Sequence, residues 1–154
     1  MSILKKKGEW RFGYKDTWSL DCSLSPIIAA GLTKFHDVLK EKNAKGGCIG
    51  IPNGFMKNEE EWVTDSDVQD WLDTIQQMIY AFEDNAPEIR DFDFSFNMIE
   101  VEDAVPIPGC SKPYHIEPTN QDNYDAFRAG EKEHQEKVQK GLELFAKHYK
   151  DLWW

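Results

Sequence analysis

The chain has 154 residues, of which 40% are hydrophobic and 13% aromatic, so it is long enough to bury the core of one domain. Its 28 acidic residues outnumber 18 basic ones, and the formal net charge of -10 disfavours direct binding to nucleic acid or to an anionic membrane surface. No apolar run approaches the roughly 20 residues that a membrane span needs, and no apolar segment follows the charged N-terminus, so we expect a soluble intracellular protein.

Residues 1–23 are predicted to form an arm that precedes the first helix. Most of the arm mixes aromatic, basic and turn-forming residues without periodicity, which predicts an ordered loop. Ser25 and Pro26 then supply an N-cap and a proline at the first helical position. From there to about residue 42 an apolar stripe at helical spacing predicts a helix, carried by Leu24, Ile28, Leu32, Phe35 and Leu39. The glycine pair at 46–47 closes it.

The second predicted helix has the clearest pattern in the chain. Thr64 or one of the two residues after it can cap the helix. The apolar residues that follow at steps of three and four are Val68, Leu72, Ile75, Ile79 and Phe82. The helix should end near Asn85, because Pro87 disfavours helical geometry in the residue before it. The preceding residues, 48–63, are expected to be a connection.

Residues 86–119 form a proline-rich insertion between the second and third helices. Three phenylalanines alternate with polar residues at 92, 94 and 96, which predicts a short strand or an extended strip laid over the helices. The insertion can also form a short β-hairpin. A connection of this length is often functional in a compact domain. The third helix is then predicted to run from about residue 121 to residue 153.

These elements predict a mainly α fold. We expect a single domain over residues 1–154, with three principal helices in an antiparallel bundle. Gly130 and Gly141 each mark a close approach or a bend, because glycine weakens a helix by about 1 kcal/mol relative to alanine. Asp21 is expected to cap the first helix or to accept a buried hydrogen bond. The residues expected to share one core are Trp18, Leu20, Leu72, Ile79, Phe82, Leu142, Phe145 and Trp153.

No set of residues has the spacing of a known catalytic or metal site, so we predict a protein that is not an enzyme and uses no cofactor. Glu131 and His134 have the spacing of half a di-iron motif, but the sequence holds no second copy, which favours a solvated charged face. The other three histidines have no ligand-like neighbours, so each is interpreted as a satisfied surface or core side chain. Cys22, Cys48 and Cys110 form no CxxC pair and are interpreted as reduced packing residues.

One segment of this acidic chain is basic and aromatic. Between residues 5 and 18, lysines and an arginine alternate with aromatic side chains. Aromatic planes and cationic donors suit a nucleotide, through base stacking and phosphate pairing. The candidate ligand-binding residues are Trp10, Arg11, Tyr14, Lys15 and Trp18. In the alternative interpretation the aromatics seal the helices and the lysines keep the arm soluble.

Three sequence motifs are spread over nearly the whole chain. The first is Tyr-Lys-Asp-Thr-Trp-Ser-Leu-Asp at residues 14–21, with its Trp-x-Leu-Asp end. The second is Trp-Leu-Asp at residues 71–73 with Met-Ile-Tyr-Ala-Phe-Glu at residues 78–83. The third is Gly-Leu-Glu-Leu-Phe at residues 141–145, closing on Leu152 and Trp153. Together these motifs resemble a widespread family of tailed-bacteriophage proteins for which no activity is established. The resemblance implies expression in the cytoplasm of an infected host bacterium and brings no catalytic residues.

Two hypotheses follow for the function. In the first, a phage accessory protein sequesters a nucleotide-type signal of a host antiviral defence system, in a pocket rimmed by the basic and aromatic arm. This hypothesis expects Arg11 and one or more arm aromatics to face a shared concavity, and it allows several subunits to combine as a homo-oligomer around the ligand. In the second, an acidic inhibitor or adaptor binds a host protein, with nucleic-acid mimicry as one means.

Overall fold

The computed structural model describes residues 4–6, 9–11, 13–14, 17, 19–46, 50–56, 63–101 and 114–152. The chain divides into two compact units. The first unit combines Met1–Asp84 with Glu136–Trp154, and the second unit is Asn85–Gln135. The third principal helix belongs to both units, because the boundary falls inside it. The single domain over residues 1–154 stays a prediction.

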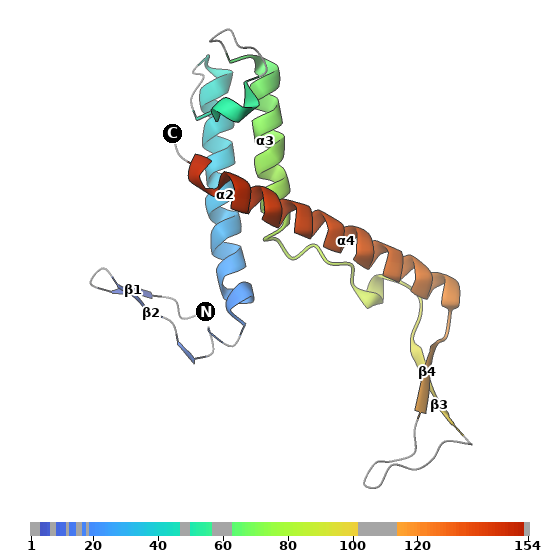
Figure 1. The fold of residues 1–154 in the computed structure, drawn as a ribbon. Coiled ribbons are helices and arrows are strands. Elements are labelled where there is room, and N and C mark those ends of the chain that lie inside the picture. The colour runs from blue at the N-terminus through green and yellow to red at the C-terminus, as the bar shows by residue number, and fades with distance from the viewer. Residues whose placement is uncertain are drawn as a thin grey trace. The chain divides into compact units, whose positions relative to one another are not determined.

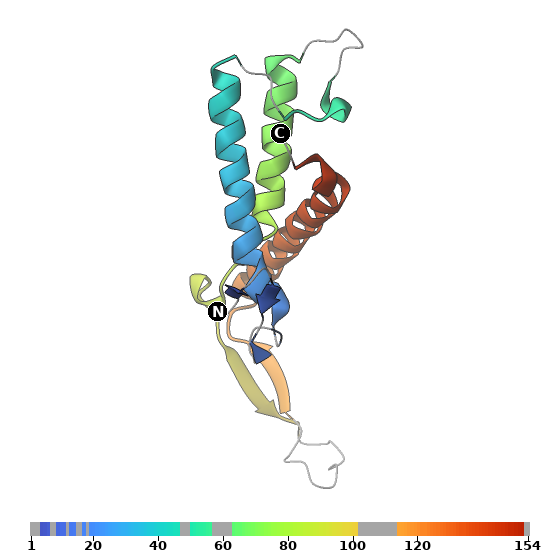
Figure 2. The same cartoon turned by 90° about the vertical axis from the view of Figure 1, so that its left-hand side faces the viewer.

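The fold is mainly helical, as predicted, and its principal helices in the described ranges are α2 (Leu20–Ala44), α3 (Asp65–Tyr80) and α4 (Gln121–His148). In the first unit α2 and α3 lie side by side and run antiparallel, as Figure 1 and Figure 2 show from two directions. The C-terminal part of α4 crosses this pair (Figure 1). The described ranges also contain the 3-10 helices η1 (Asn53–Phe55), η2 (Ile89–Asp91) and η3 (Tyr149–Asp151).

The strands of the described ranges form two antiparallel pairs. β1 (Leu4–Lys6) pairs with β2 (Glu9–Arg11), where the sequence predicted a loop. β3 (Phe96–Glu100) pairs with β4 (Tyr114–Pro118), which confirms the hairpin predicted for the insertion. Among the helices of the described ranges, none combines the length and the apolar character needed to cross a bilayer.

The first helix begins earlier than predicted. α2 starts at Leu20 rather than after a Ser25 cap, so Pro26 lies inside the helix and removes one backbone hydrogen bond there. Asp21 is exposed in the first turn, where the positive end of the helix dipole favours a carboxylate. The prediction that Asp21 is a cap or a buried acceptor was therefore wrong. The helix ends just before Gly46, whose φ of 81° suits glycine, as the glycine pair predicted.

The second helix begins with a capping box. The Thr64 hydroxyl oxygen accepts a hydrogen bond from the Asp67 backbone N–H at 3.3 Å, and Asp67 Oδ2 accepts one from the Thr64 backbone N–H at 2.9 Å. This reciprocal arrangement satisfies two amide hydrogens that the helix itself leaves without partners. Thr64 was one of the three cap candidates predicted from the sequence. The helix ends at Tyr80, earlier than the predicted Asn85.

The core of the first unit lies between α2 and α3. Leu72 and Ile79, predicted as core residues, are buried, and the half-buried rings of Phe82 and Phe145 meet edge to face with centroids 4.9 Å apart. The buried core cluster consists of Leu32, Leu39, Trp71, Leu72, Ile75, Met78 and Ile79. Leu32 and Leu39 of the predicted α2 stripe therefore pack against the stripe predicted for α3.

Two predicted core residues are exposed instead. Leu20 lies at the start of α2, and Leu142 is 39% exposed on α4. The contact of α4 with α3 runs through Gly141, and because consecutive residues on an α-helix point about 100° apart, Leu142 faces away from that contact. Trp18 and Trp153, also predicted for the core, lie outside the described residues.

The two glycines of α4 have different surroundings. A Cβ on Gly141 would overlap the backbone carbonyl oxygen of Gln77 and would lie 2.6 Å from the Cβ of Ala81, so the predicted close approach is confirmed. A Cβ on Gly130 would meet its nearest neighbour, Pro87 Cγ, at 3.8 Å, which is an ordinary contact. Only Gly141 is thus required by the packing.

In the second unit an extended segment packs on the first half of α4. The rings of Phe92 and Phe94 lie 5.5 and 5.6 Å from that of Phe127, and Phe94 also meets Tyr124 at 5.6 Å. Phe127 is the buried member of this aromatic cluster. The alternating phenylalanines therefore form a strip on a helix, one of the two arrangements predicted for them.

Candidate functional site

The β3–β4 hairpin carries apolar side chains that are exposed to solvent. The register pairs Met98 with Ile116 and Glu100 with Tyr114, and residues two apart on a strand share a face. One face of the hairpin therefore gathers four large apolar side chains, which we call the hairpin face: Phe96, Met98, Tyr114 and Ile116. All four are exposed, and Met98 and Ile116 reach 66% and 59%.

The hairpin face continues the aromatic cluster of the second unit. Phe96 lies 5.5 Å from the ring of Phe94 and 5.8 Å from that of Tyr124, both edge to face. At the base of the hairpin, Thr119 Oγ1 accepts a hydrogen bond from the Ser95 backbone N–H at 2.9 Å. Phe96, at the start of β3, therefore packs against the aromatic cluster. Met98, Tyr114 and Ile116 are exposed to solvent.

Most of the chain's net negative charge belongs to the second unit. Residues 85–135 contain 11 Asp and Glu against 4 Lys and Arg, a formal net charge of -7 out of the total of -10. Glu100 shares the hairpin face, and Glu117 lies on the opposite face with His115, whose Nε2 is 2.9 Å from its carboxylate. The hairpin face therefore belongs to a strongly acidic unit.

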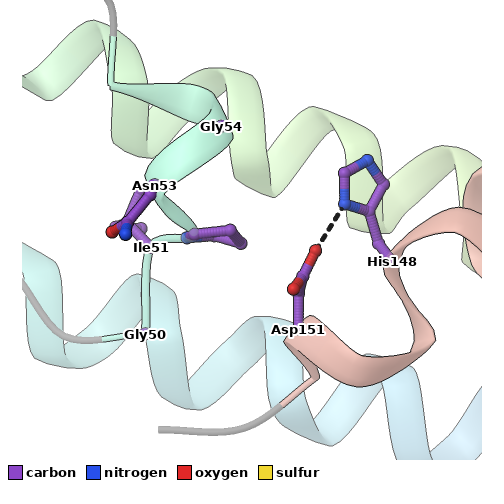
Figure 3. Close-up of a pocket in the computed structure, with 7 residues that line it drawn as sticks. Gly50, Ile51, Asn53, Gly54, His148 and Asp151 are labelled. Carbon is purple, nitrogen blue, oxygen red and sulfur yellow. Dashed lines mark hydrogen bonds and ion pairs between the residues drawn. The ribbon is translucent and has the colours of Figure 1, made fainter.

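A second candidate site is a cavity of about 360 Å³ in the first unit. Figure 3 shows its two walls, a loop on one side and the end of α4 on the other. The described lining residues are Gly50, Ile51, Pro52, Asn53, Gly54, His148 and Asp151. His148 Nδ1–H donates a hydrogen bond to Asp151 Oδ2 at 2.8 Å, since a carboxylate can only accept.

Aromatic packing holds the two walls of this cavity together. His148, only 7% exposed, lies 5.3 Å from the ring of Phe55 and 5.4 Å from that of Trp71. Phe55 and Trp71 are themselves 4.9 Å apart. Sequence reasoning interpreted His148 as a satisfied histidine, and its contacts with Asp151 and the two rings agree with that interpretation. The sequence carries no signal for the pairing of the loop with the end of α4.

The predicted ligand-binding residues of the arm are only partly described. Trp10 and Arg11 lie in β2, where the backbone register sets them opposite Lys5 and Leu4. Tyr14 is 78% exposed, so its ring is not part of the core. The side chains of Trp10 and Arg11, and the whole of Lys15 and Trp18, lie outside the described residues. The shared concavity expected for these side chains thus stays a prediction.

Other residues considered for chemistry have simple surroundings. Glu131 accepts a hydrogen bond from Arg128 at 2.7 Å, in keeping with a solvated charged face. Cys22 is exposed, so its predicted packing role was wrong, and Cys48 and Cys110 lie outside the described residues. Within the described part of the chain, no three His, Cys, Asp or Glu side chains are grouped so that they could hold a metal ion.

The sequence patterns that would have revealed the hairpin face are short. Phe96 and Met98 alternate with polar Asn97, and Tyr114 and Ile116 alternate with His115, on either side of a proline-rich segment. The alternation marks two half-apolar strands, but it does not say whether the apolar face is covered.

Comparison of the chain with protein-family models, with curated proteins and with solved structures found no match.

Proposed function

We propose that this protein is a non-enzymatic, acidic inhibitor or adaptor that binds another protein through the hairpin face. The observation that carries the proposal is the exposure of Met98 and Ile116, which are cross-strand neighbours on a face without a covering element among the described residues. Monomeric proteins seldom expose a contiguous group of large apolar side chains, and such patches are typical of protein-binding surfaces.

The charge of the second unit indicates the kind of partner. A net of -7 on residues 85–135 attracts a basic surface and repels a second copy of the same unit. We therefore commit to a different protein, whose contact surface has an apolar centre and a basic rim. The resemblance to tailed-bacteriophage proteins supports a host protein in the cytoplasm of an infected bacterium as that partner, and a nucleic-acid-binding groove would supply the basic rim.

The test compares two faces of one strand. Met98 and Ile99 are adjacent and exposed on opposite faces of β3, so Met98→Glu and Ile99→Glu make the same kind of change at matched positions. The wild-type protein is used to capture a bacterial partner, which is then purified and titrated directly against each variant. We expect Met98→Glu to weaken binding tenfold or more and Ile99→Glu to weaken it less than about threefold.

Ionic strength provides the second measurement. Raising salt from about 50 to 300 mM should slow association, because electrostatic steering is screened beyond the Debye length. Equal effects of the two substitutions would contradict the hairpin face as the contact. Self-association of the purified protein through the same residues, detected by light scattering, would replace the heterologous partner with a second copy.

Sequestration of a nucleotide-type signal is the second candidate function. The described structure favours it at one point, since the ring of Tyr14 is exposed and accessible for stacking. A thermal-shift screen against cyclic and linear nucleotides tests it, because a ligand at a hundred times its dissociation constant stabilises the fold by about 2.7 kcal/mol. A shift that is lost in Arg11→Ala or Tyr14→Ala would support this function, and no shift with any nucleotide would remove it.

A further inference from the structure

Met98 places an accessible thioether on the hairpin face. It is 66% exposed, whereas Met78 is fully buried in the core of the first unit and Met56 is half-buried. Met1 lies outside the described residues. A solute as small as hydrogen peroxide therefore reaches Met98 in the folded protein, but it reaches Met78 only when the core opens.

The position of Met98 on the hairpin face gives its oxidation a consequence. The strand register sets Met98 directly opposite Ile116, and Phe96 is its neighbour two residues away on the same face of β3. Met98 is the most exposed of the four apolar residues of this face. A partner that covers the hairpin face must therefore remove water from the Met98 side chain. Flexible, polarisable methionines suit such a contact only while they are apolar.

We infer that Met98 is a redox-modification site, at which a peroxide converts the hairpin face from an apolar to a polar surface. The inference rests on the proposed function, because it concerns the surface that binds the partner there. A lone pair of the Met98 sulfur attacks the hydroxyl oxygen of the peroxide, so an S–O bond forms as the O–O bond breaks. Sulfur loses two electrons to the peroxide. The hydroxyl proton passes to the departing oxygen, and the products are methionine sulfoxide and water, or an alcohol from an organic hydroperoxide.

The sulfoxide opposes partner binding through its hydration. Its oxygen is a hydrogen-bond acceptor that water satisfies in the free protein, and burying it against an apolar surface without a donor costs free energy. The thioether it replaces carries no such penalty. Methionine sulfoxide reductases restore the thioether, so the change is reversible in cells. Oxidation should therefore release the partner, and reduction should restore binding.

Peptide mass spectrometry of the full-length protein after graded exposure to hydrogen peroxide tests the modification. Quenching and then dithiothreitol return reversibly oxidised cysteines to thiols and leave methionine sulfoxide in place. We expect Met98 to be oxidised about tenfold or more faster than Met78, whose protection also reports that the fold is intact.

Retention on a phenyl column measures the apolar character of the surface without any partner. Peroxide should lower the retention of the wild-type protein. Met98→Leu is the matched variant, because it keeps an apolar side chain without sulfur at this site and retains every other methionine and cysteine. Its retention after peroxide should equal its own retention before peroxide.

A titration then connects the modification with binding. The partner captured on the wild-type protein is purified and titrated against untreated, oxidised and reductase-treated protein. We expect oxidation to weaken binding about fivefold or more, and the reductase to restore it.

Three results would overturn the inference. Met98 reacts no faster than Met78, retention falls equally in Met98→Leu, or the oxidised protein binds the partner as tightly as the untreated protein. In the third case the effect of Met98→Glu separates the two proposals. If Met98→Glu still weakens binding, the hairpin face remains the contact and only the redox inference is lost; if it does not, the proposed function is lost as well.

Discussion

Replacement of Gly141 by alanine tests how α4 packs on α3. In an isolated helix this change should stabilise by about 1 kcal/mol, because glycine is a poor helix former. In the structure the added Cβ would overlap the carbonyl oxygen of Gln77 and would lie 2.6 Å from the Cβ of Ala81. Both opposing atoms belong to the backbone or sit directly on it, so neither can move by a change of rotamer.

The size of the effect follows from the contact distances. Carbon atoms in favourable contact are about 3.5 to 4.0 Å apart, so α4 must move away from α3 by about 1 Å. That movement loosens neighbouring contacts, among them the edge-to-face pair of Phe82 and Phe145. Overpacking of this kind costs about 1 to 3 kcal/mol, and more where a backbone is in the way. Because neither opposing atom can move by a change of rotamer, we expect a cost of about 2 to 3 kcal/mol, and after the gain of about 1 kcal/mol in helix propensity Gly141→Ala should lower the free energy of unfolding by about 1 to 2 kcal/mol.

Gly31→Ala is the matched control in the same unit. Gly31 is also inside a helix, α2, but a Cβ there would meet nothing within 4 Å. This variant should therefore raise the free energy of unfolding by up to about 1 kcal/mol. Urea denaturation followed by circular dichroism at 222 nm measures both changes. If Gly141→Ala is as stable as wild type, or gains stability as Gly31→Ala does, the close packing of α4 on α3 is refuted.

Three further substitutions test the cap, the core and the aromatic cluster. Thr64→Ala should lower the free energy of unfolding by about 1 kcal/mol, since the buried Asp67 carboxylate loses the hydrogen bond from the Thr64 hydroxyl and the Asp67 amide loses one of its two acceptors, and Thr64→Ser should restore most of it in the same urea assay. Leu39→Ala, at a fully buried site, should cost about 2 to 5 kcal/mol, whereas Leu142→Ala should cost less than about 1; similar losses would contradict their burial. Phe127→Ala should cost about 3 kcal/mol in the second unit and speed amide hydrogen exchange in β3 and β4; unchanged exchange there would mean that the aromatic cluster does not support the hairpin.

The helices were predictable where the signal is local. α3 was located from the sequence because its cap and its apolar stripe involve residues within a few positions of one another. α2 was only partly located: its stripe was correct, but the serine and proline at 25–26 suggested a start that the structure places earlier.

Leu142 on α4 shows what a local sequence pattern cannot predict. The stripe of α4 predicted Leu142 as a core residue, yet the helix meets α3 through Gly141, so the phase of the buried face is set by the partner helix. The same limit applies to the β3–β4 hairpin. The alternation of apolar and polar residues indicates its strands. Whether its apolar face is buried depends on which other segments of the chain pack on it.

Composition, capping residues and helical periodicity were sufficient to establish a mainly α chain with an acidic character and a hairpin-forming insertion. The contact of Gly141 with α3, the exposure of the hairpin face and the meeting of the loop at residues 50–54 with the His148–Asp151 pair required the folded structure. Caps and helical turns join residues at most about four positions apart, so a sequence window contains both partners. These sites join segments distant in sequence, and their geometry depends on the packing of whole helices against one another.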